Sequence, residues 1–299
     1  MKLAAAITIS QLALGGPGSG CTGPNCGRPA GFGVIPTSEV PLTHDQDRVE
    51  LKARRYLMSD LSGAKARYKA QFGNVLDADK AKELFPDYRA DRSKYAVAVH
   101  EPSSYLIKQI FNDELNSPPP LDKLNQVLFT AGGAGAGKTT MIENNPETNE
   151  LLRHAQVVYD GTGGNLVPKI DKALAAGKDV HVAYVHRDPL DAFVNGILPR
   201  AMKPGYGRTV NMERAADMHI ASRNGIEAVA DKYKDNPHVK LTVIDNSHGW
   251  GNAQISDLAH LPPITRDKAK LTGDFRQALE KEHNEGRVSD DVYKNTLGS

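Results

Sequence analysis

The sequence predicts an α/β fold in which helices cover both faces of a largely parallel sheet. Two observations predict this class. Short apolar runs suited to buried strands recur along the chain, and segments with helical periodicity separate them. Such alternation is typical of a parallel sheet with helices on both faces. The best-defined unit is the segment 126–140, QVLFTAGGAGAGKTT, in which an apolar run leads through glycines into a helix.

The glycine-rich part of this segment fits the phosphate-binding pattern G-x-x-x-x-G-K-[ST]. Glycine has no Cβ, so backbone N–H groups can close around phosphate oxygens, and the following helix directs its positive end to the same place. The expected ligands are ATP and Mg²⁺, with Lys138 on the β- and γ-phosphates and the Thr139 hydroxyl on the metal. The expected nucleotide-binding residues here are Gly132, Gly133, Ala134, Gly135, Ala136, Gly137, Lys138, Thr139 and Thr140.

Composition argues against several other classes of function. The 299 residues include 37 Lys and Arg against 36 Asp and Glu, so no global field favours nucleic acid or membranes. Aromatic residues make up only 6% of the chain, which disfavours base-stacking platforms for single strands. The chain has no apolar run of about eighteen residues, which is the length needed to span a membrane. The length allows one sizeable domain with appendages.

Residues 1–44 are expected to form a disordered leader rich in Gly, Pro, Ser and Thr. The mildly apolar first fifteen residues leave a short signal peptide open as an alternative, although Ser10 and Gln11 interrupt them. The two cysteines, Cys21 and Cys26, can form a disulfide loop or half of a metal site that has no further ligand nearby. The run GGPGSG resembles leaders of phage and mobile-element proteins.

A strand is expected at Val75–Leu76, with Asp77 and Asp79 directly past its end. Open α/β sheets place their chemistry at that edge. A purely structural interpretation competes with this one: Asp79 can cap a helix over residues 80–84, with Asp77 in a turn. Spacing alone favours the capping interpretation.

The other elements are expected in regular order. Further strands are expected at 157–159, 180–185 and 241–244, and helices at 103–115, 140–144, 170–176, 190–197 and 211–233. A basic, glycine-containing stretch, 199–209, can bend as a lid or form a plain surface loop.

The expected domains are the leader, a helical extension over 45–73 broken near Ser62 and Gly63, a catalytic domain over 74–260, and a helical tail over 261–299. The tail either packs on the core or binds a partner.

Nucleotide binding alone leaves the reaction open. A kinase needs a base near the acceptor hydroxyl, positive charge on the transferring phosphoryl group, and a means to exclude water. Four carboxylates are expected at strand ends, namely Asp77, Asp79, Asp160 and Asp245. Arginines that could act from a mobile segment are Arg187, Arg200 and Arg208.

Three segments resemble the zeta toxin family, kinases related to those of toxin–antitoxin modules. YDGTGGN at 159–165 resembles that family's acid-Gly-Thr substrate strand, and 182–246 resembles its next strand, Arg-bearing lid and last strand ending in Asn. LDADKAKELFPDY at 76–88 resembles its strand-end Asp-x-Asp motif, which carries the catalytic Asp. In the family this motif follows the phosphate loop, whereas here it precedes it. We therefore expect a rearranged order, which a parallel sheet tolerates if its crossovers stay right-handed.

The resemblance implies a P-loop kinase-like fold and a role for each matching residue. The implied catalytic residues are Asp79, as general base, and Lys138, Arg200 and Arg208, which contact the phosphates. The implied substrate ligands are Asp77, Asp160 and Thr162. Asn246 is implied to contact the nucleotide. Toxin members of the family phosphorylate UDP-N-acetylglucosamine. Where they tend to have a basic residue after the acid-Gly-Thr-Gly, this chain has Gly164, which weakens the case for a diphosphate-bearing sugar.

We therefore expect a Mg²⁺- and ATP-dependent small-molecule kinase, bacterial or phage-borne, in the cytoplasm of the cell or of the phage host. An antitoxin protein is the implied partner. Two other functions compete with this one: a nucleotide-binding switch or structural phage module, and a kinase acting on nucleic-acid ends. A switch needs no base, so removal of Asp79 separates the first. The second predicts a basic groove with aromatic stacking, which the composition does not favour.

Overall fold

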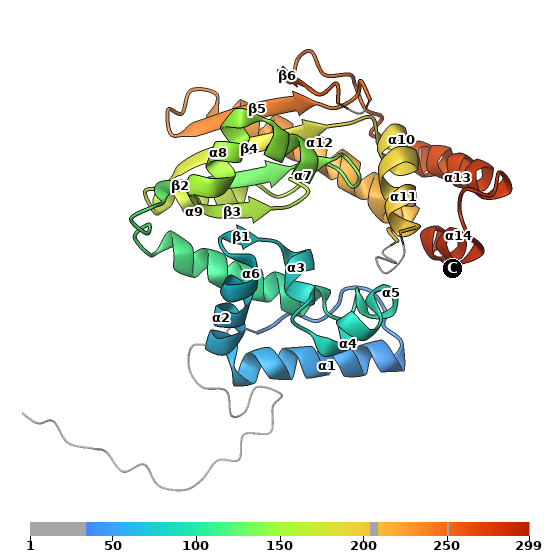
Figure 1. Ribbon diagram of the computed structural model, residues 1–299, viewed down its shortest axis with the longest axis horizontal. Helices are drawn as coiled ribbons and strands as arrows, with labels where there is room; N and C mark the ends of the chain where they lie inside the picture. The colour runs from blue at the N-terminus through green and yellow to red at the C-terminus, as the bar shows by residue number, and fades with distance from the viewer. Residues whose placement is uncertain (1–33, 204–208, 250, 299) are drawn as a thin grey trace, which may run out of the picture. The chain divides into compact units, whose positions relative to one another are not determined.

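A computed structural model describes residues 34–203, 209–249 and 251–298 of the chain (Figure 1). In this part of the chain a six-stranded sheet has the order β1-β3-β2-β4-β5-β6. The strands are β1 Val75–Leu76, β2 Leu124–Ala131, β3 Ala155–Asp160, β4 Asp179–His186, β5 Val239–Asp245 and β6 Gln254–Ser256. The first five pair in parallel, so their carboxyl ends meet at one edge. The expected α/β class is confirmed.

Of the two edge strands of the sheet, the sequence predicted one and missed the other. The two-residue strand β1 joins in parallel as expected, with Val75 opposite Val158 and Leu76 opposite Tyr159 of β3. The other edge strand, β6, was not expected and pairs antiparallel with β5. It is only three residues long and its Ile255 is 62% exposed, so it has no apolar run to mark it.

Both faces of the central strands are apolar, and helices cover each of them. Val127 and Phe129 of β2 lie in one apolar layer, and Leu128 lies in the other. The first layer receives side chains from α6 His100–Leu115, α9 Val167–Ala175 and α12 Met212–Tyr233. The second receives them from α7 Lys138–Asn144 and α8 Pro146–His154. The helices expected between the strands are confirmed, with boundaries shifted by a few residues.

Short helices precede the phosphate loop: α1 His44–Ser59, α2 Leu61–Phe72, α3 Ala78–Lys82, α4 Pro86–Ala90 and α5 Arg92–Tyr95. The expected break near Ser62 and Gly63 is wrong by two residues. Asp60 interrupts the helix with φ −150° and caps α2 by accepting a hydrogen bond from the Gly63 N–H at 2.8 Å. Buried residues of α1 and α2 pack against α6, and through it they belong to the same apolar cluster as Phe129.

A helical segment follows β4 and is not α-helical throughout. Its parts are α10 Pro189–Ala192, a π-helix Phe193–Ile197 and α11 Leu198–Ala201. In the π-helix the Leu198 N–H donates to the carbonyl of Phe193, five residues earlier. Helix was expected over 190–197 and is confirmed, although part of it is a π-helix. A lid or a plain surface loop was expected over 199–209, and the helix continues to residue 201.

The C-terminal helices pack behind this segment. They are α13 Lys268–Asn284 and α14 Asp290–Leu297, and Ser289 caps α14 as expected. The rings of Phe193 and Phe275 stack with centroids 4.5 Å apart, inside an apolar cluster that also holds Met212 of α12. The tail therefore packs on the core, which is one of the two alternatives left open by the sequence.

Several expectations fall on residues that the structure does not describe. They concern the leader as far as residue 33, with Cys21 and Cys26, and Arg208. Within the described ranges, none of the helices combines the length and apolarity needed to cross a membrane.

Candidate active site

The phosphate loop joins β2 to α7 at the carboxyl edge of the sheet. Gly137 is the N-cap of α7 and has φ 85°, and Gly135 has φ 72°. These left-handed conformations favour glycine. Space requires it as well, because a Cβ on Gly135 would lie 2.4 Å from the carbonyl oxygen of Ala192. The loop therefore has the curled backbone that the sequence pattern predicts.

The carbonyl groups of the loop are held by the surrounding protein. Two carbonyls accept from the loop segment itself: Gly132 O from Lys138 Nζ at 3.3 Å, and Gly133 O from Ala136 N at 3.2 Å. The next three accept from side chains outside it: Ala134 O from His219 Nε2 at 2.8 Å, Gly135 O from Arg187 Nη1 at 3.1 Å, and Ala136 O from Asn246 Nδ2 at 2.9 Å. In a planar trans peptide the N–H points opposite to the C=O. The N–H groups of Gly135 and Gly137 therefore point away from these partners, as an anion-binding loop requires.

Two carboxylates lie at the carboxyl ends of neighbouring strands. Asp77 follows β1, and Asp160 ends β3 and accepts a hydrogen bond from the Thr130 hydroxyl of β2. Burial, together with the charges of Asp160 and Asp79, raises the pKa of Asp77 to about 6. Carboxylates that repel each other in this way stabilise an incoming cation or share a proton.

The capping interpretation of this segment is corrected by the structure. The N-cap of α3 is Asp77, whose Oδ1 accepts from the Asp79 N–H at 2.7 Å, and Asp79 lies inside the first turn. The side chain of Asp79 is 37% exposed and pairs with Lys82 at 3.0 Å. Asp79 is therefore not used as a cap, and its carboxylate reaches the cavity described next.

One cavity of about 120 Å³ brings most of the predicted site residues together. Its described lining includes Asp77, Asp79, Lys138, Asp160, Thr162 and Arg200. These residues lie in or just after β1, β3, α3, α7 and α11, which meet at the carboxyl edge. Cation-bearing and carboxylate-bearing elements thus face each other over a small space beside the phosphate loop.

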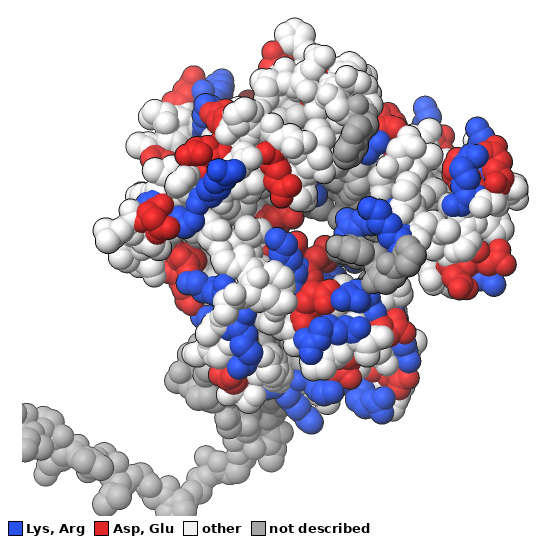
Figure 2. Space-filling view, in the orientation of Figure 1, with Lys and Arg blue, Asp and Glu red and all other residues white. Residues whose placement is uncertain are grey.

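A second cavity of about 750 Å³ opens next to it and shares Asp77, Asp79 and Arg200. It adds Thr139 and Thr140 of α7 and cationic side chains of Lys80, Arg92 and Lys203. Figure 2 shows acidic and basic side chains bordering a hollow near the centre of this face. A third cavity, about 320 Å³, lies beside Thr130, Lys138 and Asp160. Together these spaces offer room for more than one ligand group.

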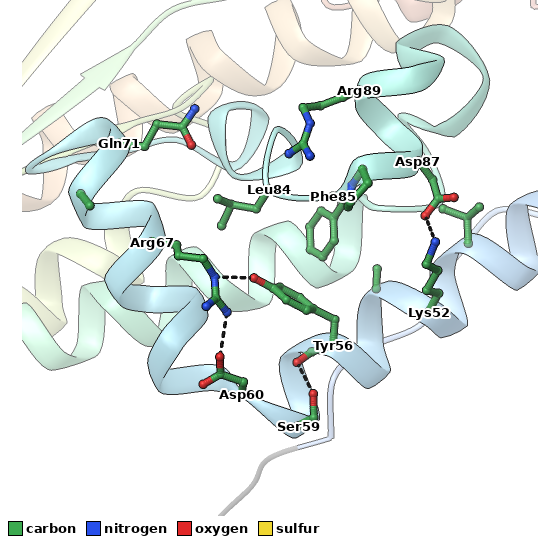
Figure 3. A pocket seen from close by; sticks show the side chains of 14 residues that line it. Lys52, Tyr56, Ser59, Asp60, Arg67, Gln71, Leu84, Phe85, Asp87 and Arg89 are labelled. Atoms are coloured by element: carbon green, nitrogen blue, oxygen red, sulfur yellow. Dashed lines mark hydrogen bonds and ion pairs between the residues drawn. The ribbon is translucent and has the colours of Figure 1, made fainter.

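A larger cavity, about 970 Å³, lies elsewhere, between α1, α2 and the segment 84–89 (Figure 3). Its floor is apolar, with the rings of Tyr56 and Phe85 packed edge to face. Its charges pair with each other: Lys52 with Asp87, and Arg67 with Asp60, both at 2.8 Å. Since these four charged side chains are paired with one another, the size of this cavity alone does not mark it as the reaction site.

Three residues that hold the loop were judged differently, or not at all, from the sequence. Asn246 was expected to contact the nucleotide; in the structure it is 6% exposed and donates to Ala136 O at 2.9 Å. Arg187 was expected as a mobile arginine, but it contacts Gly135 O and pairs with Asp191 at 2.5 Å. His219 of α12 was missed. It lies among the buried residues Ala215, Ala216 and Ser222, and a lone polar ring on an apolar face needs a partner, which is the signal that could have found it.

The donor set suits Mg²⁺ in the manner of phosphate-binding enzymes. In the described part of the chain no group of three or more His, Cys, Asp or Glu is placed to hold a metal by itself. Mg²⁺ is commonly bound by one or two protein oxygens together with substrate phosphates. Thr139, in the first turn of α7, and the nearby carboxylates supply oxygens of that kind.

Comparisons with known proteins give few matches. No protein-family model matches the chain, and no curated protein matches it. Two matching crystal structures are of complexes of AvrRxo1-ORF1 with AvrRxo1-ORF2, one native and one with sulphate ions. The chain of the native complex is 13% identical to this chain, and the match covers 71% of this chain and 86% of that one. The chain of the complex with sulphate is 11% identical, and the match covers 74% of this chain and 84% of that one. Both matches have a TM-score of 0.38. At this level of similarity the chemistry must be inferred from the site itself.

Proposed function

We propose that this protein is an ATP- and Mg²⁺-dependent phosphotransferase of zeta-toxin type, which transfers a γ-phosphoryl group to a hydroxyl of a small molecule. One observation carries the proposal. Lys138 of the phosphate loop and the carboxylates of Asp77, Asp79 and Asp160 line a single small cavity. A P-loop protein that only binds or hydrolyses nucleotide also needs a carboxylate for its metal. The three carboxylates here supply that one and others that can accept the proton of an acceptor hydroxyl.

Each side of the cavity has a distinct task. The N–H groups of the loop and Lys138 bind the β- and γ-phosphates, and Arg200 places a second positive charge where the phosphoryl group leaves. The Thr139 hydroxyl would hold Mg²⁺ together with the phosphates, and the metal would supply neutralisation of the charge that develops during transfer. The buried setting strengthens these interactions, because fewer water molecules screen them.

A carboxylate of the pair Asp77 and Asp79 accepts the proton of the acceptor hydroxyl. The resemblance to zeta toxins assigns this role to Asp79, and its 37% exposed side chain is accessible to a substrate. Asp77 is the alternative, because a pKa of about 6 suits a base that works near neutral pH. Separate substitutions distinguish the two, since the rate depends only weakly on the carboxylate that does not take the proton.

The rearranged chain order is part of the same proposal. β1 precedes the phosphate loop in the sequence, yet it lies in parallel beside β3, and its carboxyl end faces the same edge as that of β2. A carboxylate on β1 therefore reaches the cavity as it would if its strand followed the loop. This arrangement supports a permuted zeta-type domain.

The acceptor is proposed to be a nucleotide sugar of the UDP-N-acetylglucosamine kind, and the proposed partner is an antitoxin that restrains the activity in the cytoplasm. Gly164 is not an arbitrary departure from the basic residue of the toxins. A Cβ at this position would lie 2.9 Å from the Cβ of Ala221 on α12, so the tight packing favours glycine. The charge for a diphosphate then comes from Lys80, Arg92 or Lys203 in the adjoining cavity.

The test is incubation of the protein with Mg-ATP and a panel of nucleotide sugars, followed by mass spectrometry. The expected product carries one additional phosphoryl group on a sugar hydroxyl and is absent with Lys138→Ala. ATP hydrolysis that no acceptor changes, together with unaltered hydrolysis by Asp79→Asn and Asp77→Asn, would identify a nucleotide switch instead. Labelling of oligonucleotide ends but no sugar would identify a nucleic-acid end kinase.

A further inference from the structure

His219 contacts the phosphate loop from a helix far away in the sequence. We infer that His219 is a positioning residue for the triphosphate: it holds the Ala134 carbonyl away from the cavity, so that the next N–H, that of Gly135, points at a phosphate oxygen. The inference rests on the proposed nucleotide binding. It names a residue outside the phosphate-binding pattern that decides whether the loop can bind its ligand.

The hydrogen bond itself is well defined. The His219 ring is 5% exposed, and its Nε2 lies 2.8 Å from Ala134 O. Burial lowers the pKa of His219 to about 4, so the ring is neutral at physiological pH and has one N–H. Because the partner is a carbonyl oxygen, the hydrogen atom must lie on Nε2. The bond therefore fixes the tautomer of the ring and the direction of the Ala134 peptide.

The ring also explains a glycine that the phosphate-binding pattern does not demand. Gly133 occupies a variable position of that pattern. Its φ is outside the left-handed region, so backbone strain is not the reason for glycine. A Cβ on Gly133 would instead lie 2.2 Å from Nδ1 of His219. The loop and the imidazole are therefore in direct contact, with no space for a methyl group between them.

The same face of α12 also supports the loop after β3. A Cβ on Gly225 would lie 2.1 Å from the carbonyl oxygen of Gly163, and a Cβ on Gly163 would lie 3.6 Å from Ser222 Oγ. His219, Ser222 and Gly225 follow at intervals of three residues, which places them along one side of a helix. Helix α12 thus contacts both the phosphate loop and the loop after β3 that is predicted to contact the acceptor. His219 provides its contact with the phosphate loop.

Two substitutions separate the hydrogen bond from mere packing. His219→Phe keeps a ring but removes the donor, and leaves the Ala134 carbonyl buried without a partner. His219→Gln keeps an N–H at similar reach. The matched control is His181→Phe on β4: His181 is 1% exposed, its pKa is lowered to about 4 by burial, and its Nε2 lies 2.8 Å from Thr242 Oγ1. It lies five residues before the end of the strand, away from the loop.

Isothermal titration calorimetry with Mg²⁺ and a non-hydrolysable ATP analogue measures affinity, and thermal melting measures stability. We expect His219→Phe to raise the Kd about tenfold or more, the cost of one lost buried hydrogen bond, with His219→Gln within about threefold of wild type. His181→Phe is expected to lower the melting temperature comparably at unchanged Kd. Equal affinity of His219→Phe and wild type, or an equal loss in His181→Phe, would overturn the inference.

A second variant keeps the test decisive if His219→Phe does not fold. Gly133→Ala keeps the histidine at position 219 but displaces its ring from the loop. This variant is also expected to raise the Kd by about tenfold. Unchanged affinity in folded Gly133→Ala would contradict the inference. Absence of any binding by the wild-type chain would instead refute the proposed function, and the inference with it.

Discussion

The two sides of the cavity are built on different principles. On the phosphate side, five consecutive carbonyls of the loop have hydrogen-bond donors, and the charge offered to a ligand comes from N–H dipoles that do not titrate. On the carboxylate side, Asp77 follows a strand of only two residues, and its charge is opposed by burial and by Asp160. The first side is rigid and insensitive to pH, whereas the second depends on protonation and on cations.

This difference indicates where the free energy of binding arises. The loop is preorganised, so little reorganisation is needed when phosphates arrive. The carboxylates instead lower their free energy when a positive charge approaches, since they repel each other without it. We expect substitutions on the phosphate side to remove turnover, and substitutions on the carboxylate side to change rates and pH dependence more selectively.

The largest effect is expected for Lys138→Ala. Lys138 is the one charged side chain in the segment 132–140, it lines the small cavity, and the proposed function assigns it to the phosphates. Its removal should lower triphosphate turnover by about three orders of magnitude, since loss of a single preorganised donor already costs about 10²–10³. Initial rates of ADP release measure the effect, with the exposed Lys234→Ala as control. Near-normal turnover would show that the loop does not act as proposed.

Asp79→Asn tests the carboxylate side. The substitution keeps the shape of the side chain, and α3 keeps its cap at Asp77, so the fold should survive. Phosphoryl transfer should fall by about two orders of magnitude or more, the range of a lost general base. Transfer to the acceptor and ATP affinity are measured in parallel. If Asp77→Asn lowers transfer and Asp79→Asn does not, the base is Asp77.

Arg200→Ala should affect the rate more than binding. Arg200 of α11 lines the cavity, and in the proposed reaction its charge is needed most when the phosphoryl group is between donor and acceptor. We expect kcat to fall about tenfold or more with less than about threefold change in ATP affinity. Arg208→Ala is expected to behave alike, and Arg55→Ala on α1 serves as control. Equal losses of affinity and rate would make these ordinary binding residues.

The smallest effect concerns stability. Because the pKa of Asp77 in the folded state is about 6 and its ordinary value is 3.8, the folded state binds more protons than the unfolded state between these pH values. Wild-type stability should therefore fall as the pH rises through this window and stay lowered above it. Asp77→Asn should be more stable than wild type above pH 6, by at most about 3 kcal/mol.

Denaturant unfolding at several pH values with a chelator present measures this difference. The gain of Asp77→Asn should vanish below the ordinary pKa of 3.8, where both side chains are neutral. The exposed Asp235→Asn corrects for the change in net charge. A gain that is equal at all pH values would point to packing as the cause and not to the buried charge.

The same division decides what could be predicted from the sequence. The phosphate loop is local: its strand, glycines and helix are adjacent in the chain, so the pattern determined its position and geometry. The supports of the loop are not local, since His219 and Asn246 lie 85 and 110 positions from the carbonyls they hold. No pattern in a single sequence pairs residues at such distances.

The carboxylate side was predicted in position but not in detail. The strand at Val75–Leu76 was found because it is apolar and precedes two carboxylates, yet the sequence could not tell which Asp caps the helix. That depends on the backbone angles of Asp77, which are extended, and on the Tyr68 hydroxyl, which accepts the Asp77 N–H at 2.9 Å. β6 was missed because three largely exposed residues carry no periodic signal.

The π-helix at Phe193–Ile197 gives the molecule an unusual sensitivity to chain length. A π-turn is an α-helix with one residue inserted. Gly196 lies in it and faces the loop so closely that a Cβ there would be 2.5 Å from Gly135 O. Deletion of one residue from this turn would restore a regular helix and rotate everything after it by about 100°. Arg200 would then leave the cavity without itself being mutated, so in this segment the number of residues, as much as their identity, decides whether an arginine is present in the site.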